Sequence, residues 1–351
     1  SVRTLRKSPG FSLTAILTLG VGIGAVTAIF SVVDSVLLQP FSFPAPDRLV
    51  ILRESLPQFS AVPLPDNPMH FATWRDGSKT MADAALIQTG SASLATGPGH
   101  PEIVNSLKVD PHFFNVLGVE PALGRAFLPG ETLKGHNNVV ILSWEAWQRY
   151  FHGDTAVMGK TLRNGGQPET VVGVMSRSFH FPRMSEMPGA VSQNAAEPYT
   201  VFHPLLRDEE NTDDGNYNYL AIGRLRPEVP LEQARTELNT LQAVFDQAHK
   251  LPVRPVVVVE PLIVEVAGGV SAALWLLLAA LGAVLLIGCV NLANLQLARA
   301  VSRERELSVR AALGAGRDRL IAAALSDSLV LAAMGGALGL GLAFAGVRLF
   351  V

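Results

Sequence analysis

The sequence predicts a membrane protein with three transmembrane α-helices and one large extracytoplasmic domain of mixed α/β structure. Of its 351 residues, 48% are hydrophobic and only 17% are charged, whereas soluble domains average about 25% charged residues. The mean hydropathy is +0.29, and three long stretches contain no charged residue. The net charge of −2 argues against a disordered chain and, with a pI of about 6.4, against a nucleic-acid-binding protein.

The first predicted span covers residues 11–38 and follows a short cytoplasmic flank at residues 1–10. Between Lys7 and Asp34 the chain has no charged residue, and roughly 20 apolar residues are enough to cross a hydrocarbon core of about 30 Å. The alternative is a cleaved signal peptide, whose apolar region would be about 7–15 residues long and would end in a small-x-small cleavage site. The apolar run is longer than that and lacks such a site, which favours a permanent span.

The second and third spans are predicted at residues 270–298 and 320–350, on either side of a cytoplasmic loop at residues 299–319. Basic residues are concentrated in this loop and in the N-terminal flank, and the positive-inside rule places both in the cytoplasm. Residues 39–268 then lie outside, and acidic residues outnumber basic ones there. We therefore expect one helix, an extracytoplasmic domain and two further helices.

The outer region is predicted to be a mixed α/β domain because short β-branched runs alternate with amphipathic segments. The clearest helix is expected at residues 231–249, after Pro230, with an apolar face that includes Leu238 and Phe245. The sequence Asn164-Gly165-Gly166 predicts a tight hairpin. Strands are expected at residues 48–53, 103–109, 139–142, 170–175, 219–225 and 256–259, shorter helices at residues 68–75, 111–117 and 144–151, and loops at residues 182–198 and 208–214.

No catalytic or metal site is predicted. Residues 153–160 are similar to a phosphate-binding loop, but five residues instead of four separate Gly153 from the Gly-Lys pair, which favours a plain loop between a helix and a strand. Cys289 is the single cysteine, and the eight histidines are scattered, so we expect them on the surface or in loops. We therefore expect no enzyme activity, metal or cofactor in this chain.

The membrane segments contain two small-xxx-small patterns, formed by Gly20 with Gly24 and by Gly335 with Gly339. Small residues let membrane helices approach closely, so these patterns predict helix packing, either within one chain or between two copies. Asp34 lies at the border of the first span, and Asp327 lies within the third. Acidic residues deep in a membrane are usually paired or functional.

The cytoplasmic loop is predicted to contain a short amphipathic helix. Glu306 and Arg310 stand four residues apart in the order that stabilises a helix, and Leu307 and Ala311 share one face. The alternative is a plain connecting loop whose arginines only set the topology.

Three groups of motifs resemble one family. The motifs Arg305-Glu306-Leu307-Ser308-Val309-Arg310-Ala311-Ala312-Leu313-Gly314-Ala315 and Gly335-Gly336-Ala337-Leu338-Gly339, within residues 270–351, resemble the FtsX-type permease domain of ABC transporters related to the macrolide exporter MacB. The motifs Phe113-Phe114-Asn115-Val116-Leu117-Gly118, Leu142-Ser143-Trp144 and Val172-Gly173-Val174-Met175 are similar to the MacB-like periplasmic core domain. The motifs Leu5-Arg6-Lys7-Ser8-Pro9-Gly10-Phe11 and Pro46-Asp47-Arg48-Leu49 resemble the acidobacterial duplicated permeases of this superfamily.

The resemblance implies a permease subunit of the bacterial inner membrane, with its large domain in the periplasm. A separate cytoplasmic ABC ATPase would bind ATP and Mg²⁺, and the membrane helices would relay its motion outward for export or envelope work, as in efflux. The other implied partners are membrane lipid and a second permease copy, with no nucleic acid. The expected ATPase-docking residues are Glu304, Arg305, Glu306, Arg310 and Leu313, and the expected packing and relay residues are Gly20, Gly24, Asp327, Gly335 and Gly339.

The sequence departs from the family pattern at two points. Asp327 stands where family members usually have a glutamate, a change that keeps the charge. The family also has a fourth transmembrane helix, and duplicated members have a second copy of the unit, so we expect this chain to be part of a longer protein. An alternative from another class is a membrane-anchored extracytoplasmic sensor or scaffold without transport. The third helix and the amphipathic loop favour the permease.

Overall fold

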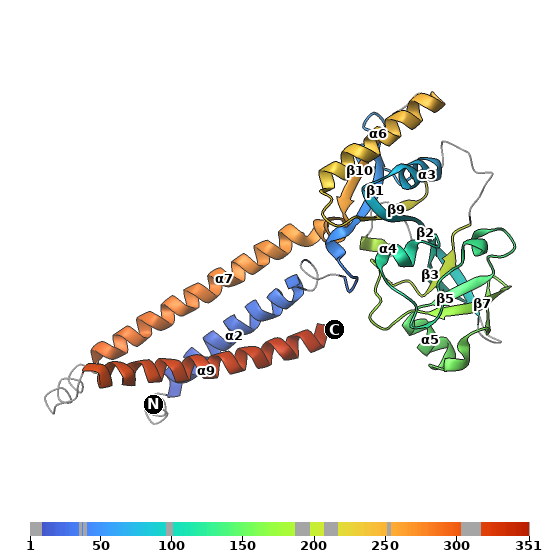
Figure 1. The fold of residues 1–351 in the computed structure, drawn as a ribbon. Helices are drawn as coiled ribbons and strands as arrows, with labels where there is room; N and C mark the ends of the chain where they lie inside the picture. Colours follow the sequence, from blue (N-terminus) through green and yellow to red (C-terminus); the bar gives the residue numbers. More distant parts are fainter. Residues whose placement is uncertain are drawn as a thin grey trace. The chain divides into compact units, whose positions relative to one another are not determined.

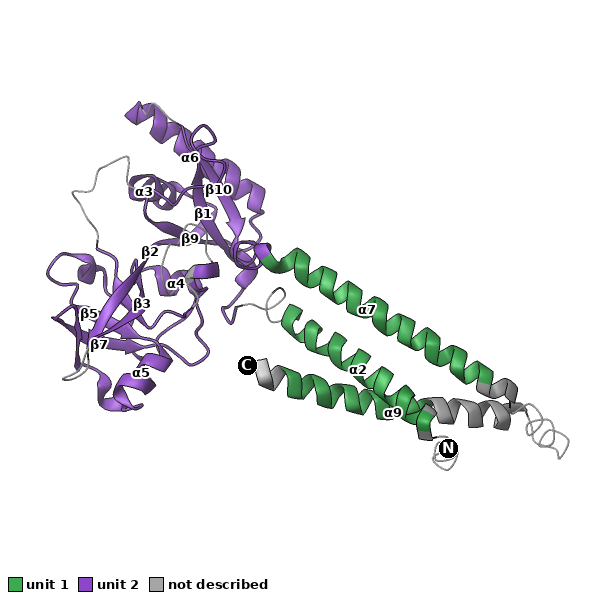
Figure 2. Cartoon of the chain, turned by 180° about the vertical axis from the view of Figure 1, so that it is seen from behind, with its two compact units in different colours: residues 1–40, 270–351 green, residues 41–269 purple. Residues whose placement is uncertain are grey.

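The structure of the chain is a computed structural model, which describes residues 9–34, 37, 41–95, 101–186, 197–206, 217–250, 254–302 and 317–350. The chain forms two compact units (Figure 2). Unit 1 combines Ser1–Pro40 with Val270–Val351, and unit 2 is Phe41–Gly269. Within the described ranges, three helices are long and apolar enough to cross a membrane, and unit 2 is a mixed α/β domain. The predicted fold class is therefore confirmed.

The described residues of unit 1 form three helices (Figure 1): α2 (Pro9–Val33), α7 (Leu262–Ser302) and α9 (Arg317–Phe350). Their apolar stretches have mean hydropathies of 2.3, 2.6 and 1.9 respectively. Helix α7 begins well before residue 270, the predicted start of the second span. The adjacent Gly268 and Gly269 suggest a helix end, since each costs about 1 kcal/mol in a helix interior. The apolar residues before them continue the helix nevertheless.

Unit 2 contains one mixed sheet with the strand order β10-β1-β9-β2-β3-β8-β5-β7-β4, while β6 pairs with β2 and β7. Two pairs, β3 with β8 and β5 with β7, are parallel, and the others are antiparallel. The strands are β1 (Leu49–Ser55), β2 (Met81–Ala95), β3 (Glu102–Val109), β4 (Leu123–Gly124), β5 (Val139–Leu142), β6 (Thr161–Asn164), β7 (Gln167–Val174), β8 (Val201–Pro204), β9 (Leu220–Leu225) and β10 (Val256–Pro261).

In the described part of unit 2, four α-helices accompany this sheet. They are α3 (Pro68–Gly77), α4 (Phe113–Leu117), α5 (Trp144–Phe151) and α6 (Leu231–His249), and short 3₁₀ helices occur at Pro46–Arg48, Pro129–Thr132, Thr155–Val157 and Met184–Glu186. Helices α3 and α6 lie beside β1, β9 and β10, whereas α5 lies near β5 and β7 (Figure 1). Helices α3 and α6 thus cover the end of the sheet that contains β10 and β1, and α5 covers the end that contains β5 and β7.

Local sequence rules explain several of these elements. Helix α6 begins directly after Pro230, as predicted, and ends where Lys250 turns left-handed at φ 52°. The β6–β7 hairpin turns at Gly165 and Gly166, whose φ values of 55° and 86° are both positive. Two positive φ values are what a type I′ turn requires, and glycine adopts them without strain.

Strands β2, β4 and β8 were not predicted from the sequence, and β6 was predicted only as one arm of the hairpin at Gly165 and Gly166. Strand β2 is the longest in the sheet, but much of it consists of Ala, Ser and Gly, which have low β-propensity. It is held by β9 on one side and β3 on the other, so tertiary pairing overrides its local preference. Strand β8 is only four residues long and pairs with β3 and β5. The predicted loops at residues 182–198 and 208–214 fall largely outside the described residues.

Three apolar clusters form the core of unit 2. One includes Leu49, Ile51 and the α4 residues, one lies under α3 and α6 and includes Val50 and Leu52, and one lies under α5. Alternate residues of β1 therefore face different clusters, as the two-residue period of a strand requires. Both faces of β1 are buried.

Candidate functional site

The predicted packing glycines bring α2 and α9 into close contact. A methyl group added at Gly339 would lie 2.9 Å from Ile23 Cβ and 3.0 Å from the backbone oxygen of Gly20. One added at Gly335 would lie 2.7 Å from Leu19 Cβ, and one at Gly24 would lie 3.0 Å from the backbone oxygen of Gly339. The two backbones touch where side chains are absent, which is how small-xxx-small patterns act in membranes.

Helix α7 also contacts α2 at glycine positions. A methyl group at Gly22 would lie 2.7 Å from Leu285 Cδ1, and one at Gly288 would lie 3.1 Å from Thr18 Cγ2. Elsewhere α7 is open, because no residue of its most apolar stretch is buried. Helix α2 thus contacts both other helices through glycines, and α7 keeps a large apolar surface.

The remaining predicted site residues can be placed only in part. Asp327 belongs to α9, but its side chain is not among those described, whereas Asp34 is half-buried just after α2. The five expected docking residues lie outside the described residues: Glu304, Arg305, Glu306, Arg310 and Leu313. The glycines are therefore the predicted site residues whose surroundings are known.

The first turns of α7 belong to the core of unit 2. Leu262 and Ala267 are buried, and Ile263 and Val266 pack against the cluster that contains Phe41. Residues 262–269 thus lie in unit 2, and the rest of the same helix lies in unit 1.

A buried polar cluster lies on the other face of β1. The Nδ1 atom of His70 is 2.8 Å from Glu54 Oε2, and the backbone N–H of Asn67 donates to Glu54 Oε1 at 2.9 Å. Burial raises the pKa of Glu54, and its bonds to His70 and Asn67 partly offset this. These contacts attach α3 to the sheet.

Asp66 adds a second carboxyl to this buried cluster. Its Oδ2 accepts the backbone N–H of Ala221 at 2.7 Å, while its Oδ1 has no partner among the described residues. Burial, reinforced by nearby Glu54, raises the pKa of Asp66 well above its ordinary value. A buried oxygen without a partner costs free energy, so Asp66 is more easily kept in its neutral form.

The expectation that all histidines lie on the surface or in loops is wrong for two of them. His70 is fully buried beside Glu54, and buried His203 has its Nε2 2.9 Å from Glu169 Oε2. The carboxylate partners are 16 and 34 residues away in the sequence. A burial that depends on such distant partners leaves no local pattern in the sequence.

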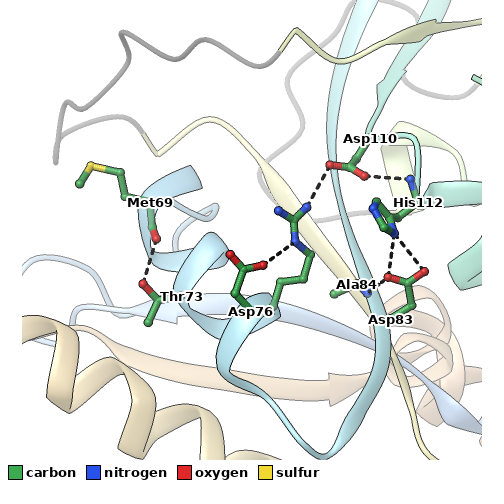
Figure 3. A network of polar contacts seen from close by, with 8 residues as sticks. Met69, Thr73, Asp76, Asp83, Ala84, Asp110 and His112 are labelled. Atoms are coloured by element: carbon green, nitrogen blue, oxygen red, sulfur yellow. Dashed lines mark hydrogen bonds and ion pairs between the residues drawn. The ribbon is translucent and has the colours of Figure 1, made fainter. Parts of the chain in front are cut away.

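A further polar network ties α3 to β2, β3 and α4 (Figure 3). Arg75 lies 3.3 Å from both Asp76 and Asp110, and His112 Nδ1 lies 3.0 Å from Asp83 Oδ1. Asp110 also accepts the backbone N–H of His112 at 2.8 Å, and burial raises the pKa of Asp110. In the part of the chain that the structure describes, no three His, Cys, Asp or Glu side chains are grouped to hold a metal ion. This network connects elements of the fold.

The segment at residues 153–160 does not form a phosphate cradle. Lys160 Nζ is paired with Asp154 Oδ2 at 2.5 Å, and Asp154 also accepts the backbone N–H of Ala156. The segment leads into strand β6, whereas a phosphate-binding loop leads into a helix whose N-terminus faces the phosphate. The geometry agrees with a loop between α5 and β6.

Comparisons with known proteins match two family models along the chain. Residues 12–241 match the family described as MacB-like periplasmic core domain, and residues 278–351 match the family described as FtsX-like permease C-terminal. Together these matches include most of α2, most of unit 2, most of α7 and all of α9.

Individual relatives are distant in sequence. The chain is 24% identical to the uncharacterized ABC transporter permease YknZ of Bacillus subtilis over 241 residues, which are 68% of this chain and 55% of YknZ. It is 25% identical to the macrolide export ATP-binding/permease protein MacB of Chromobacterium violaceum over 66% of this chain and 33% of that protein. The crystal structure of the periplasmic region of MacB from Actinobacillus actinomycetemcomitans is 14% identical, with a TM-score of 0.43, and the match covers 61% of this chain and 88% of that one.

Proposed function

We infer the function from the family: the chain belongs to the ABC transporter permeases that have a MacB-like periplasmic core domain and an FtsX-like permease domain. It is a membrane protein with a large extracytoplasmic domain. It spans about half the length of YknZ and a third of that of MacB. The activity of the whole assembly is therefore part of the proposal.

The proposed role is mechanotransmission, in which the chain relays motion from a cytoplasmic ATPase to its outer domain. The observation that carries this role is helix α7, which contributes residues to both units. Its 41 residues would extend for about 60 Å at about 1.5 Å per residue, twice the thickness of a hydrocarbon core. A helix of this length is suited to carry displacement out of the membrane.

The energy would come from a separate ABC ATPase that binds ATP and Mg²⁺. The MacB relative of Chromobacterium violaceum is named an ATP-binding/permease protein, so its name assigns both parts to one protein. In this chain, the segment from Arg303 to Leu313 is proposed as the docking helix because of its amphipathic pattern and its Glu306–Arg310 pair. The chain itself would hydrolyse no nucleotide.

The proposed location is the bacterial inner membrane, with unit 2 in the periplasm. Basic residues on the cytoplasmic side support this orientation. The open apolar surface of α7 would contact lipid or a second permease copy, either as a homodimer or as the other half of a duplicated protein of the acidobacterial type. The work done outside would be export or another envelope task.

Charge reversal in the docking segment tests the proposal. Glu306→Lys places like charges four residues apart, which costs only a few tenths of a kcal/mol in helix stability. Recognition should suffer far more, because a charge at a small interface contributes strongly to binding. We expect the partner ATPase to co-purify with the wild type and to be lost with Glu306→Lys, at equal melting temperature in detergent.

Asp318→Lys is the matched control, since it makes the same charge change at the start of α9, outside the docking segment but on the same proposed side of the membrane. It should retain the ATPase. Equal recovery of the ATPase with Glu306→Lys would contradict the docking proposal. If no ATPase accompanies the wild type either, the sensor or scaffold alternative is favoured.

A further inference from the structure

An ion pair inside unit 2 joins the first turns of α7 to the central sheet. Arg53 on β1 is paired with Glu265 on α7, and only 8% and 5% of their side chains are exposed. Burial lowers the pKa of the Arg53 guanidinium, while the nearby carboxylates of Glu260 and Asp66 partly raise it. One buried cation therefore stands among several acidic groups.

The pair adds a directional contact to an otherwise apolar attachment. Leu262 and Ala267 hold α7 through apolar burial, which is non-directional and allows a helix to rotate or slide. A buried guanidinium and carboxylate must stay together, because either charge alone would be costly to keep away from water. Glu265 can meet Arg53 only when α7 presents the correct face at the correct height.

Strand β1 extends this attachment through the sheet. Arg53 faces the α7 side, whereas the next residue, Glu54, faces the opposite side and holds α3 through His70. The strand is hydrogen-bonded to β10 on one edge and β9 on the other. A displacement of α7 at Glu265 would therefore reach both covered faces through two consecutive residues.

We propose that the Arg53–Glu265 pair is a positioning element that sets the rotation and height of α7 on β1. Its role in transmitting motion rests on the proposed function. Under that function, the pair is the contact through which motion of α7 is passed to the outer domain. The fixed position of α7 is a property of the chain alone, so it can be measured without any ATPase.

The test measures how precisely α7 is held within unit 2. Spin labels are placed at Val244 on α6 and Val264 on α7, which are 63% and 51% exposed, in the full chain with Cys289→Ala. Double electron–electron resonance should give one narrow distance distribution. Glu265→Gln should broaden or split it, because the amide no longer holds the guanidinium charge.

Glu260→Gln is the matched control, because it makes the same chemical change beside Arg53 at a residue that forms no ion pair with it among the described contacts. It should leave the distribution narrow. A purely structural contribution would instead lower the melting temperature and leave the distribution unchanged.

A narrow distribution in folded Glu265→Gln would overturn the proposal. If that variant does not fold, Arg53→Met with Glu265→Met is measured instead, because apolar replacement of both partners often keeps a buried site stable. That double variant should fold with a broadened distribution, and a narrow one would again overturn the proposal. The distance distribution tests the Arg53–Glu265 proposal, and recovery of the ATPase with Glu306→Lys tests the proposed function. Because the two measurements are independent, failure of one proposal can be distinguished from failure of the other.

Discussion

Replacing one glycine in α9 tests whether the close contact between α2 and α9 stabilises the membrane unit. In Gly339→Ala the new methyl group would lie 2.9 Å from Ile23 Cβ and 3.0 Å from the backbone oxygen of Gly20. Contacts this short require movement, and a backbone oxygen cannot swing aside as the end of a side chain can. The two helices must therefore separate or shift along each other.

The expected magnitude follows from a comparison with Gly336→Ala in the same helix. A methyl group at Gly336 meets nothing within 4 Å, so this control measures only the gain in helix propensity, about 1 kcal/mol. Overpacking typically costs about 1–3 kcal/mol. Relative to the control, Gly339→Ala should thus be destabilised by about 1–3 kcal/mol, or roughly 5- to 150-fold in the unfolding equilibrium.

The assay is reversible unfolding of the full chain in mixed micelles with increasing SDS, followed by far-ultraviolet circular dichroism. The midpoint should move to lower SDS for Gly339→Ala than for Gly336→Ala. Identical midpoints would refute the reasoning, because they would mean that the helices separate at no measurable cost. The glycine pattern would then have no part in packing these helices.

Two predictions concern unit 2. Asp66→Asn should make the stability of unit 2 depend less on pH. The pKa of Asp66 is higher in the folded state than in the unfolded state, so the contribution of this residue to stability is greatest below about pH 3.9 and declines as the pH rises towards its folded-state pKa. Melting temperatures at pH 5 and pH 8 should therefore differ less in the variant, and an unchanged difference would contradict the raised pKa. Lys160→Ala should leave the heat of calorimetric titration with MgATP unchanged from the wild type, because Lys160 is paired with Asp154 in a loop that leads into a strand. Binding of MgATP that the substitution abolishes would disprove the prediction that this loop holds no phosphate.

The elements that could be predicted from the sequence are those determined by residues close together in the chain. The gap between Lys7 and Asp34 predicts a span without knowledge of any neighbour, because the cost of a charge in hydrocarbon is paid by the residue itself. Helix α6 and the turn at Gly165 and Gly166 were likewise predicted, since an amphipathic period, a proline and positive φ values act over a few residues. The glycines of α2 and α9 were predicted to be packing residues, but their partners were not identifiable from the sequence.

Other features depend on residues far apart in the chain. Strand β2 has little β-propensity of its own and exists because β9 and β3 hydrogen-bond to it. His70 looks like a surface residue until Glu54 is brought against it, and Glu265 looks like the border of a membrane segment until Arg53 meets it.

The sequence by itself determined the three apolar helices, the α/β character of the outer domain and the family. The tertiary structure alone decided that α2 contacts α9 and α7 through glycines, that α7 begins inside the outer domain, and which acids and bases share a buried site. The physical reason is the range of the forces involved. Hydropathy, propensity and turn geometry act within a few residues, whereas burial of a charge is tolerated only when its partner arrives from another part of the chain.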